Sequence, residues 1–287
     1  MPRPELVCRP PYAHSVTDVL DRVALREVYD AQLRAWLPEK LPAEARIERD
    51  GPVLRAVGLF GGGFVTYRSL DGLSGAELDE LIVRQRDVFV ARGESVEWKL
   101  HGHDEPADLP SRLIAAGFVP EEQETVVIGA AAPLAAASVD VEGVRLREVT
   151  ARADLDRIAA MEQAVWSEDK SHLANALEAE LAADPTGTTV VVAESADDSV
   201  SAGPVLSAGW VRYVRGTRFA TLWGGSTLVE WRGRGIYKAL VRYRARLAVE
   251  RGFSYLQVDA SDESRPILER NGFIPVTTTT PYVHPAP

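Results

Sequence analysis

Four residues in the second half of the chain, Arg232-Gly233-Arg234-Gly235, place two arginines and two glycines directly before a stretch with helical spacing. The first amides of a helix have no partner within the helix and carry partial positive charge, so anions bind there. Glycine lets the chain turn tightly and lets phosphate oxygens approach the amides, and arginine adds charged donors. The stretch therefore favours a pyrophosphate-binding turn. A tight surface turn with solvated arginines is the alternative.

The dinucleotide-binding motif G-x-G-x-x-G fits this turn less well. Lys238 stands where the third glycine is required, and no series of parallel βαβ units precedes it.

The elements that must position the turn are indicated by the spacing of apolar residues. Strands are expected at 144–149, 188–193, 204–214, 218–228, 255–259 and 273–283, and helices at 154–166, 172–182, 236–251 and 264–270. The three strands from 188 to 228 are expected to form an antiparallel meander, with 194–203 as a hairpin connection. Gly252 is expected to end the helix after the turn, because glycine accepts the left-handed conformation.

An internal repeat with an offset of 159 residues relates the two halves of the chain. Residues 81–100 align with 240–259 and, after a short insertion within residues 101–110 of the first half, Leu113-Ile-Ala-Ala-Gly-Phe-Val-Pro120 matches Leu268-Glu-Arg-Asn-Gly-Phe-Ile-Pro275. This order predicts a tandem duplication, with two unrelated α/β domains as the alternative. We expect domains at 1–128 and 143–287, joined by a linker at 129–142, because GAAAPLAAAS is small, unpatterned and contains proline.

Composition excludes several classes of protein. The chain has 287 residues, 46% of them hydrophobic, and a formal net charge of −10, which argues against nucleic acid as the main partner. No apolar run is long enough to span a membrane, and the start of the chain lacks the apolar core of a signal peptide. Cys8 is the only cysteine, so no disulfide within the chain is possible. We expect a cytoplasmic protein with no membrane partner.

The turn, its helix and the repeat unit together resemble the GNAT superfamily of acyl-CoA-dependent N-acyltransferases. In that family the motif (Gln/Arg)-x-x-Gly-x-(Gly/Ala) cradles the CoA pyrophosphate, and Arg232-Gly233-Arg234-Gly235-Ile236-Tyr237 departs from it only at the last position. The resemblance implies an α/β fold of the α+β type, with two tandem GNAT-like domains. Each domain would be a mixed, mostly antiparallel sheet flanked by helices.

The resemblance also implies a donor site between the fourth and fifth strands of the second domain. The pantetheine arm would lie beside the backbone of 226–229, the pyrophosphate would lie on the turn, and Ser261 would stand where many members carry an asparagine that touches pantetheine. Capping of the last helix is an equally good reading of Ser261. The expected donor-binding residues are Thr227, Leu228, Val229, Arg232, Gly233, Arg234, Gly235, Ile236, Tyr237, Ser261 and Ser264.

Acyl transfer from a thioester to an amine needs a neutral amine and a proton for the leaving thiolate. Many members use a tyrosine four residues before the glycine of the GF turn, and Leu268 stands there. Glu230, Tyr237 and Tyr282 are the remaining catalytic candidates. Glu162, Trp166, Trp223 and His103 are the candidates for acceptor binding, although a solvated helix face or ordinary core packing would also explain them.

His101-Gly-His103-Asp104 is the one stretch that suggests a metal, but without a further His or Cys nearby we expect none. A loop lining the cleft between the halves is the preferred interpretation.

In the first half the offset places Leu73-Ser-Gly-Ala-Glu-Leu78 on the motif, so arginine is replaced by leucine and Glu77 brings a negative charge. We expect this half to be a degenerate copy that does not bind CoA.

The sequence thus predicts a GNAT-type N-acetyltransferase with acetyl-CoA as co-substrate and a primary amine of a small molecule or peptide as acceptor. It would be a monomer acting as a pseudo-dimer, or a homodimer. A non-catalytic CoA-binding sensor or interaction module is the alternative.

Overall fold

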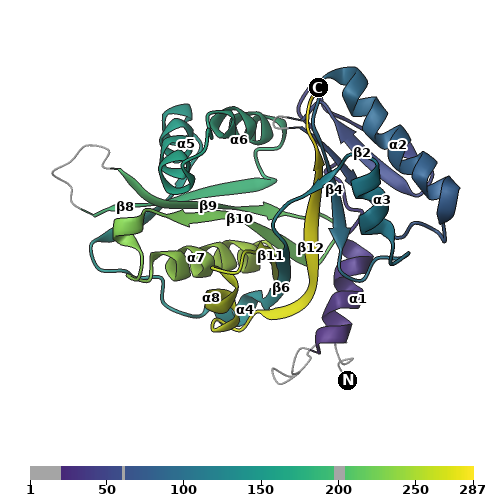
Figure 1. Ribbon diagram of the computed structural model, residues 1–287. Helices are drawn as coiled ribbons and strands as arrows, with labels where there is room; N and C mark the ends of the chain where they lie inside the picture. The colour runs from purple at the N-terminus through teal and green to yellow at the C-terminus, as the bar shows by residue number, and fades with distance from the viewer. Residues whose placement is uncertain (1–20, 60–61, 197–203) are drawn as a thin grey trace, which may run out of the picture.

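Both halves of the chain contain three consecutive strands followed by a helix, a strand, a short helix and a final long strand (Figure 1). The computed structural model describes residues 21–59, 62–196 and 204–287. The first half contains α1 (Arg22–Gln32), β1 (Arg46–Asp50), β2 (Val53–Val57), β3 (Gly63–Thr66), α2 (Gly75–Arg92), β4 (Val96–His101), α3 (Leu109–Ala115), β5 (Val119–Pro120) and β6 (Glu124–Ala130).

The second half begins after a short helix, α4 (Ala131–Ala135). It contains β7 (Val144–Val149), α5 (Arg152–Trp166), α6 (His172–Ala183), β8 (Thr188–Ser195), β9 (Val205–Tyr213), β10 (Phe219–Thr227), a 3-10 turn η1 (Val229–Trp231), α7 (Ile236–Glu250), β11 (Tyr255–Ala260), α8 (Arg265–Glu269) and β12 (Ile274–His284). The sequence predicted each strand and α-helix of this half after α4 to within about two residues, and β8, β9 and β10 form the expected antiparallel meander. Residues 197–203 of the predicted hairpin connection lie outside the described residues.

One sheet joins both halves, in the order β1-β2-β3-β4-β12-β6-β11-β10-β9-β8-β7, with β5 beside β12. The last long strand of each half pairs within the other half. β6 from the first half pairs antiparallel with β11, and β12 from the second half pairs antiparallel with β4. The two exchanged strands also pair with each other, so the halves are joined along their backbones.

Successive side chains of each strand point to opposite faces of the sheet, and different helices cover the two faces. In β10, Ala220 and Leu222 pack in the core that contains α7, whereas Phe219 packs with α1. In Figure 1, α5 and α6 lie on one side of β8, β9 and β10, and α7 and α8 lie on the other. Phe219, Thr221 and Trp223 therefore share the face covered by α1 and α6, and this face carries the pocket described below.

The expected linker is a structured part of the second half. Ala131 and Leu134 of α4 are buried in the core that α7 shares with β11, and α7 donates from Arg246 to the carbonyls of Ala135 and Ala137. The expectation of an unpatterned connection was wrong here, because small apolar residues can pack closely against a helix. The division at 128 and 143 stays a prediction, since the sheet crosses it.

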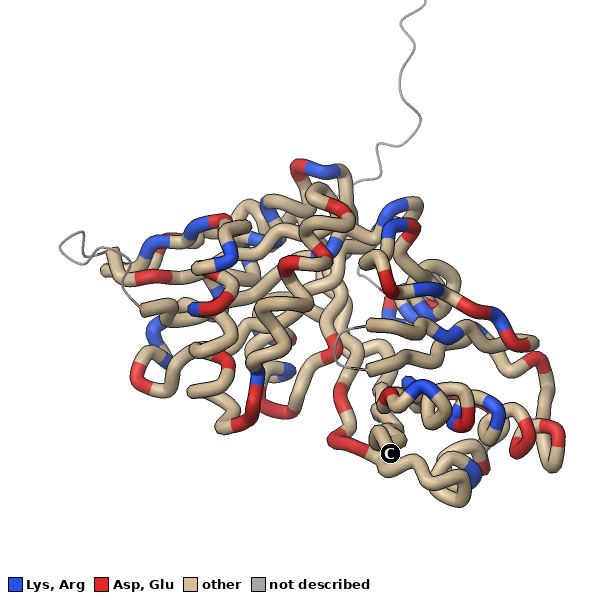
Figure 2. The backbone as a smooth tube through the Cα atoms, turned by 90° about the horizontal axis from the view of Figure 1, so that it is seen from above, with Lys and Arg blue, Asp and Glu red and all other residues tan. Residues whose placement is uncertain are grey.

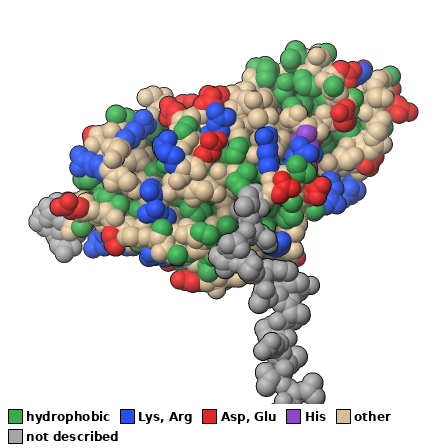
Figure 3. Space-filling model, turned by 90° about the horizontal axis from the view of Figure 1, so that it is seen from below, with side chains coloured by type: hydrophobic (Ala, Val, Ile, Leu, Met, Phe, Trp, Pro, Cys, Tyr) green, Lys and Arg blue, Asp and Glu red, His purple; other side chains and the backbone are tan. Residues whose placement is uncertain are grey.

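Charged residues of both signs are interspersed over both halves of the backbone (Figure 2) and over the face seen from below (Figure 3). In the described ranges, no helix is long and apolar enough to cross a membrane. The expected absence of nucleic-acid and membrane partners remains a prediction.

Candidate functional site

The central feature of the second half is a separation of two parallel strands. β10 and β11 pair only where Phe219 to Thr221 meets Tyr255 to Gln257, although β10 continues to Thr227 and β11 to Ala260. Beyond this point the edges of both strands that face each other carry backbone groups without a ladder partner. The separation leaves room for an extended ligand to lie along the strands.

A glycine bulge in β10 lies directly after the separation begins. The register with β9 shifts between Gly224 and Ser226, and both Gly224 and Gly225 have positive φ (65° and 99°). A Cβ on Gly225 would lie 2.7 Å from a ring carbon of Tyr237. Glycine is needed at Gly225 for its backbone conformation and for this close approach.

A buried arginine holds the bulge from the α7 side. Arg244 is 1% exposed, and its guanidinium donates to the carbonyls of Trp210 (3.2 Å) and Trp223 (3.0 Å). No described carboxylate pairs with it, and burial lowers the pKa of Arg244 to about 10, so it stays charged at neutral pH. Arg244 thus places a positive charge next to the bulge. The sequence analysis missed it, although an arginine among the apolar residues Leu240, Val241 and Leu247 on one helix was a visible signal.

The Arg-Gly-Arg-Gly turn adopts the conformation that its glycines predict. Gly233 and Gly235 have φ of 76° and 84°, and Gly235 is the N-cap of α7. No described group accepts a hydrogen bond from the amides of residues 233–235, and the first amides of α7 have no partner within the helix. The turn therefore presents a row of free donors at the end of the strand separation.

The two arginines of the turn are held by the protein itself. Arg232 Nε donates to the carbonyl of Thr227 (3.2 Å), and Arg234 donates to the carbonyl of Glu230 (3.2 Å) and stacks on Trp231. Because each guanidinium has five N–H groups, both retain donors for an anion.

Tyr237 lies across the strand separation on the α7 side. Its ring is next to Gly225, and its hydroxyl approaches Ser264 at the start of α8. Burial raises the pKa of Tyr237, while the charge of Arg244 and the bond to Ser264 act in the opposite direction. Leu268, at the usual tyrosine position, is fully buried one turn later. The structure thus supplies a phenol near the place where the resemblance expects one.

Ser261 and Ser264 lie in the turn before α8, where the Ser264 amide donates to Ser261 Oγ (3.3 Å). The two interpretations of Ser261, pantetheine contact and helix capping, both stay predictions. Of the other expected donor residues, Thr227 is buried with its hydroxyl 2.9 Å from Ser207 Oγ, and Ile236 is buried below the turn.

Glu162, Trp166 and Ser226 form a cluster on the opposite face of β10. One carboxylate oxygen of Glu162 accepts from Trp166 Nε1 (2.9 Å) and Ser226 Oγ (2.7 Å). The other oxygen is buried and has no partner among the described residues. Glu162 is 5% exposed, and burial raises its pKa. Ser226 follows Trp223 on this face of the bulged strand, so the carboxyl lies near the strand separation.

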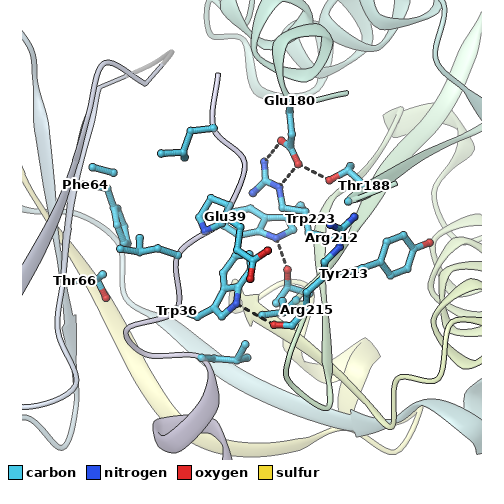
Figure 4. Close-up of a pocket in the computed structure, with 18 of the residues that line it drawn as sticks. Trp36, Glu39, Phe64, Thr66, Glu180, Thr188, Arg212, Tyr213, Arg215 and Trp223 are labelled. Carbon is cyan, nitrogen blue, oxygen red and sulfur yellow. Dashed lines mark hydrogen bonds and ion pairs between the residues drawn. The ribbon is translucent and has the colours of Figure 1, made fainter. Parts of the chain in front are cut away.

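A pocket of about 450 Å³ lies on this face, between the two halves (Figure 4). Phe64 and Thr66 of β3 approach it from the first half, and Glu180, Arg212 and Trp223 approach it from the second. Trp36 lies on the segment after α1 and donates from Nε1 to the carbonyl of Arg215 (3.3 Å). The sequence analysis missed this segment because it has no helical or strand periodicity.

The pocket ends where β10 leaves β11. Trp223 and Asp259 each lie two residues beyond the last paired residues, Thr221 and Gln257, and all four line the pocket. Asp259 forms an ion pair with Lys99 of β4 and accepts from Gln257 Nε2 (2.8 Å). A ligand in the pocket would thus reach the same opening as a ligand lying between the strands.

Three predicted site residues lie elsewhere. Tyr282 is 6% exposed in the core of the first half, so it is a packing residue that does not face the pocket. His103 bonds to Thr277 Oγ1 (2.7 Å) and Asp30 (3.0 Å), which joins the loop after β4 to α1, and it does not line the pocket. Glu230 is exposed in η1 beside the turn. The predictions for Tyr282 and His103 failed because sequence order does not reveal the strand exchange.

The described residues of the first half show no comparable opening between β3 and β4. Trp98 is the last residue of β4 that pairs with β3, and Tyr67 lies just after β3. Both side chains are buried, with their rings 5.6 Å apart. Trp98 Nε1 donates to the Tyr67 hydroxyl (3.3 Å), which in turn donates to Asp104 (2.6 Å). Protein side chains occupy this region, as the degenerate motif suggests.

No group of three or more His, Cys, Asp or Glu side chains in the described ranges is arranged to hold a metal ion. His101 lies in the pocket wall with its Nε2 3.0 Å from the Tyr29 hydroxyl, and burial lowers its pKa. The prediction of no metal is not tested by this observation alone.

Comparison by sequence finds neither a protein-family model nor a curated protein that matches the chain. Solved structures match most of its length. A GCN5-related N-acetyltransferase from Kribbella flavida has 15% identity and a TM-score of 0.61, covering 85% of this chain and 91% of its own. A conserved protein of unknown function from Staphylococcus epidermidis has 12% identity and a TM-score of 0.62, covering 86% and 96%.

A tandem GNAT protein from the clavulanic acid biosynthesis pathway is similar over 93% of both chains, with 16% identity and a TM-score of 0.59. At these identities the similarity shows the fold. The chain has the GNAT fold, with both halves arranged as in a tandem GNAT protein, which confirms the predicted fold class.

Proposed function

We propose that this protein is an acyl-CoA-dependent N-acyltransferase with one donor site, in the second half, and a primary amine as acceptor. The observation that carries the proposal is the separation of β10 from β11, with free amides at one end and the interdomain pocket at the other. The tandem GNAT fold supports it.

The donor would bind with its pyrophosphate on the amides of the Arg232 to Gly235 turn and of the first turn of α7. Its pantetheine arm would lie between the strands, and its thioester carbonyl would face the bulge at Gly224 and Gly225. The charge of Arg244 beside that bulge would stabilise the negative charge that develops on the carbonyl oxygen. We propose acetyl-CoA as the donor.

The transfer joins the amine nitrogen to the thioester carbon and breaks the carbon–sulfur bond. The protonated amine would release one proton to solvent before attack and would pass its second proton through water to Glu162 as the amide forms, because the second carboxylate oxygen of Glu162 is unpartnered. The thiolate would take a proton from the Tyr237 hydroxyl, and the tyrosinate would regain a proton from solvent as Glu162 releases its own. The acid, Tyr237, and the base, Glu162, would then lie on opposite faces of the sheet, both beside the gap between β10 and β11.

The first half would act as scaffold and as one wall of the acceptor pocket. Tyr67 and Trp98 fill the region between its own strands, and Glu77 would repel a pyrophosphate at its helix start. We therefore propose a single donor site per chain. A pseudo-dimer of this kind needs no second chain for its site, and we propose a monomer.

Release of free CoA thiol from acetyl-CoA, followed with and without a primary amine, tests the proposed function. We expect thiol release that depends on the amine and an acylated amine detectable by mass spectrometry. Binding of acetyl-CoA without turnover on any amine would contradict the proposal and favour the non-catalytic CoA-binding module.

A further inference from the structure

The interdomain pocket has apolar walls in both halves. Its volume of about 450 Å³ lies within the range of about 300 to 1,000 Å³ that small-molecule sites span. The first half supplies Ile47, Ala56 and Phe64 from three neighbouring strands, and the segment after α1 supplies Leu33, Trp36 and Leu37. A polar ligand would leave these walls without favourable contact.

Most charged groups of the pocket already have partners. Glu180 binds the Arg212 guanidinium through both oxygens (2.8 and 2.7 Å), and Arg212 also stacks on Trp223, 4.3 Å from the ring centroid. Asp184 pairs with Arg215 (2.9 Å). Lys99 is likewise paired with Asp259. These paired groups would form few further ion pairs with a strongly charged ligand.

Glu39 is the exception among the described lining residues, because the structure shows no hydrogen bond or ion pair to its carboxylate. It lies on the same segment as Trp36 and lines the pocket that Trp36 and Trp223 also line (Figure 4). A carboxylate beside indole rings favours a cation, and indole faces attract ammonium groups. Lys40 and Arg215 share the carboxylate of Asp184, so Glu39 is the unpartnered acceptor that the described lining offers to an amine that arrives protonated.

We propose that the acceptor is a primary amine carried on an aromatic or branched aliphatic body. The body binds against Phe64, Ile47 and Ala56 in the first half, and the amine lies at Trp223, where the strands separate. The choice of acceptor thus rests on the half that does not bind the donor. This inference depends on the proposed function only for the fate of the amine and not for its binding.

The test compares 2-phenylethylamine with ethylamine, two amines that differ only in the apolar body. Calorimetry without any acyl-CoA measures amine binding, and thiol release with acetyl-CoA measures transfer. We expect 2-phenylethylamine to bind at least about tenfold more tightly, since one methylene alone discriminates about tenfold or more in an apolar pocket. The advantage should appear equally in kcat/KM.

Two variants change the pocket from opposite halves. Phe64→Ser removes an apolar wall, and Ala176→Phe, on α6, fills the space without removing a core contact. Both should reduce the preference for 2-phenylethylamine to about threefold or less, while affinity for acetyl-CoA stays unchanged. Ile114→Ser is the control, because Ile114 is 53% exposed on α3 and does not line the pocket.

The outcomes separate this inference from the proposed function. Equal binding of both amines to the wild type, or a preference that Ala176→Phe leaves intact, would overturn the inference even if acetyl-CoA is turned over. A preference that both variants remove, in a protein that does not bind acetyl-CoA, would retain the pocket inference and reject acyl transfer.

Discussion

Tyr237 occupies a motif position where the resemblance expects a small residue, and its ring fills space beside Gly225. The same side chain brings a hydroxyl to Ser264, near the buried Leu268. Tyrosine at position 237 can therefore both narrow the space between β10 and β11 and supply the phenol that Leu268 does not. Sequence analysis could identify Tyr237 as a departure from the motif, but the direction of its ring depends on the bulge in the neighbouring strand.

Replacement of Tyr237 by phenylalanine should lower kcat by about 100-fold or more, since the hydroxyl would supply a proton and general acids contribute about 10² to 10⁴ in rate. Affinity for acetyl-CoA should change little, because the ring remains. Tyr243→Phe on the same helix is the matched control, since the Tyr243 hydroxyl bonds to Glu148 (3.1 Å) at the surface. A normal kcat in Tyr237→Phe, measured by thiol release, would exclude this residue as the acid.

Glu162 should appear in the pH profile of the reaction. Burial raises the pKa of this carboxyl, and only the ionised form accepts a proton, so kcat/KM should fall with decreasing pH at a point above the usual range of glutamate. Glu162→Gln should lower activity by about 100-fold and remove this limb of the profile. Glu168→Gln, which changes an exposed ion pair with Lys170, is the control. An unaltered limb in Glu162→Gln would contradict the assignment.

At the scale of elements, sequence patterns predicted most strands and helices and the meander of β8, β9 and β10, but not the strands that β6 and β12 pair with. Alternation in residues 274–284 indicates a strand, and nothing in that pattern distinguishes pairing with β4 from pairing within the second half. The same holds for β6, whose apolar run Val126 to Ile128 fits any buried strand. The turn at Gly233 and Gly235 was predictable because its chemistry is local, whereas the pocket depends on both halves.

Ionisation of Glu124, at the start of β6, should destabilise the folded protein as the pH rises. Burial first, and then the charge of Asp259, raise the pKa of Glu124 from 4.5 to about 7. A carboxyl with a raised pKa in the folded state binds its proton more tightly there. The contribution of Glu124 to the free energy of unfolding is therefore fully present below about pH 4.5 and is lost as the pH rises to about 7.

At pH 8 the Glu124→Gln variant should have a free energy of unfolding about 1 to 3 kcal/mol higher than that of the wild type, measured by denaturant unfolding. At pH 4 the two free energies of unfolding should be equal. Glu122→Gln, at an exposed neighbouring position, serves as the control for loss of net charge. A Glu124→Gln variant that is less stable than the wild type at pH 8 would show that the charged carboxylate is favourable.

At the scale of the whole molecule, the strand exchange makes the halves interdependent. The second half alone, residues 143–287, would lack β6 and α4, which would expose the edge of β11 and the core around Ala131 and Leu134. We expect this fragment not to unfold cooperatively when followed by circular dichroism, unlike the full chain. Addition of residues 1–142 as a separate chain should restore cooperative unfolding if the exchanged strands are what is missing. A cooperative transition of the fragment alone near the full-chain Tm would contradict this account.

The position of the donor site is the central claim, and calorimetric titration of acetyl-CoA tests it most directly. The wild type should bind one acetyl-CoA per chain, and the Arg232→Ala/Gly235→Glu variant should bind none, because it removes a donor, strains the turn and adds a negative charge. Gly252→Glu is the matched control, since Gly252 shares the φ of 84° with Gly235 but lies beyond the other end of α7; it should bind as the wild type does. No binding to the wild type, two sites per chain, or undiminished binding to the double variant would contradict the account.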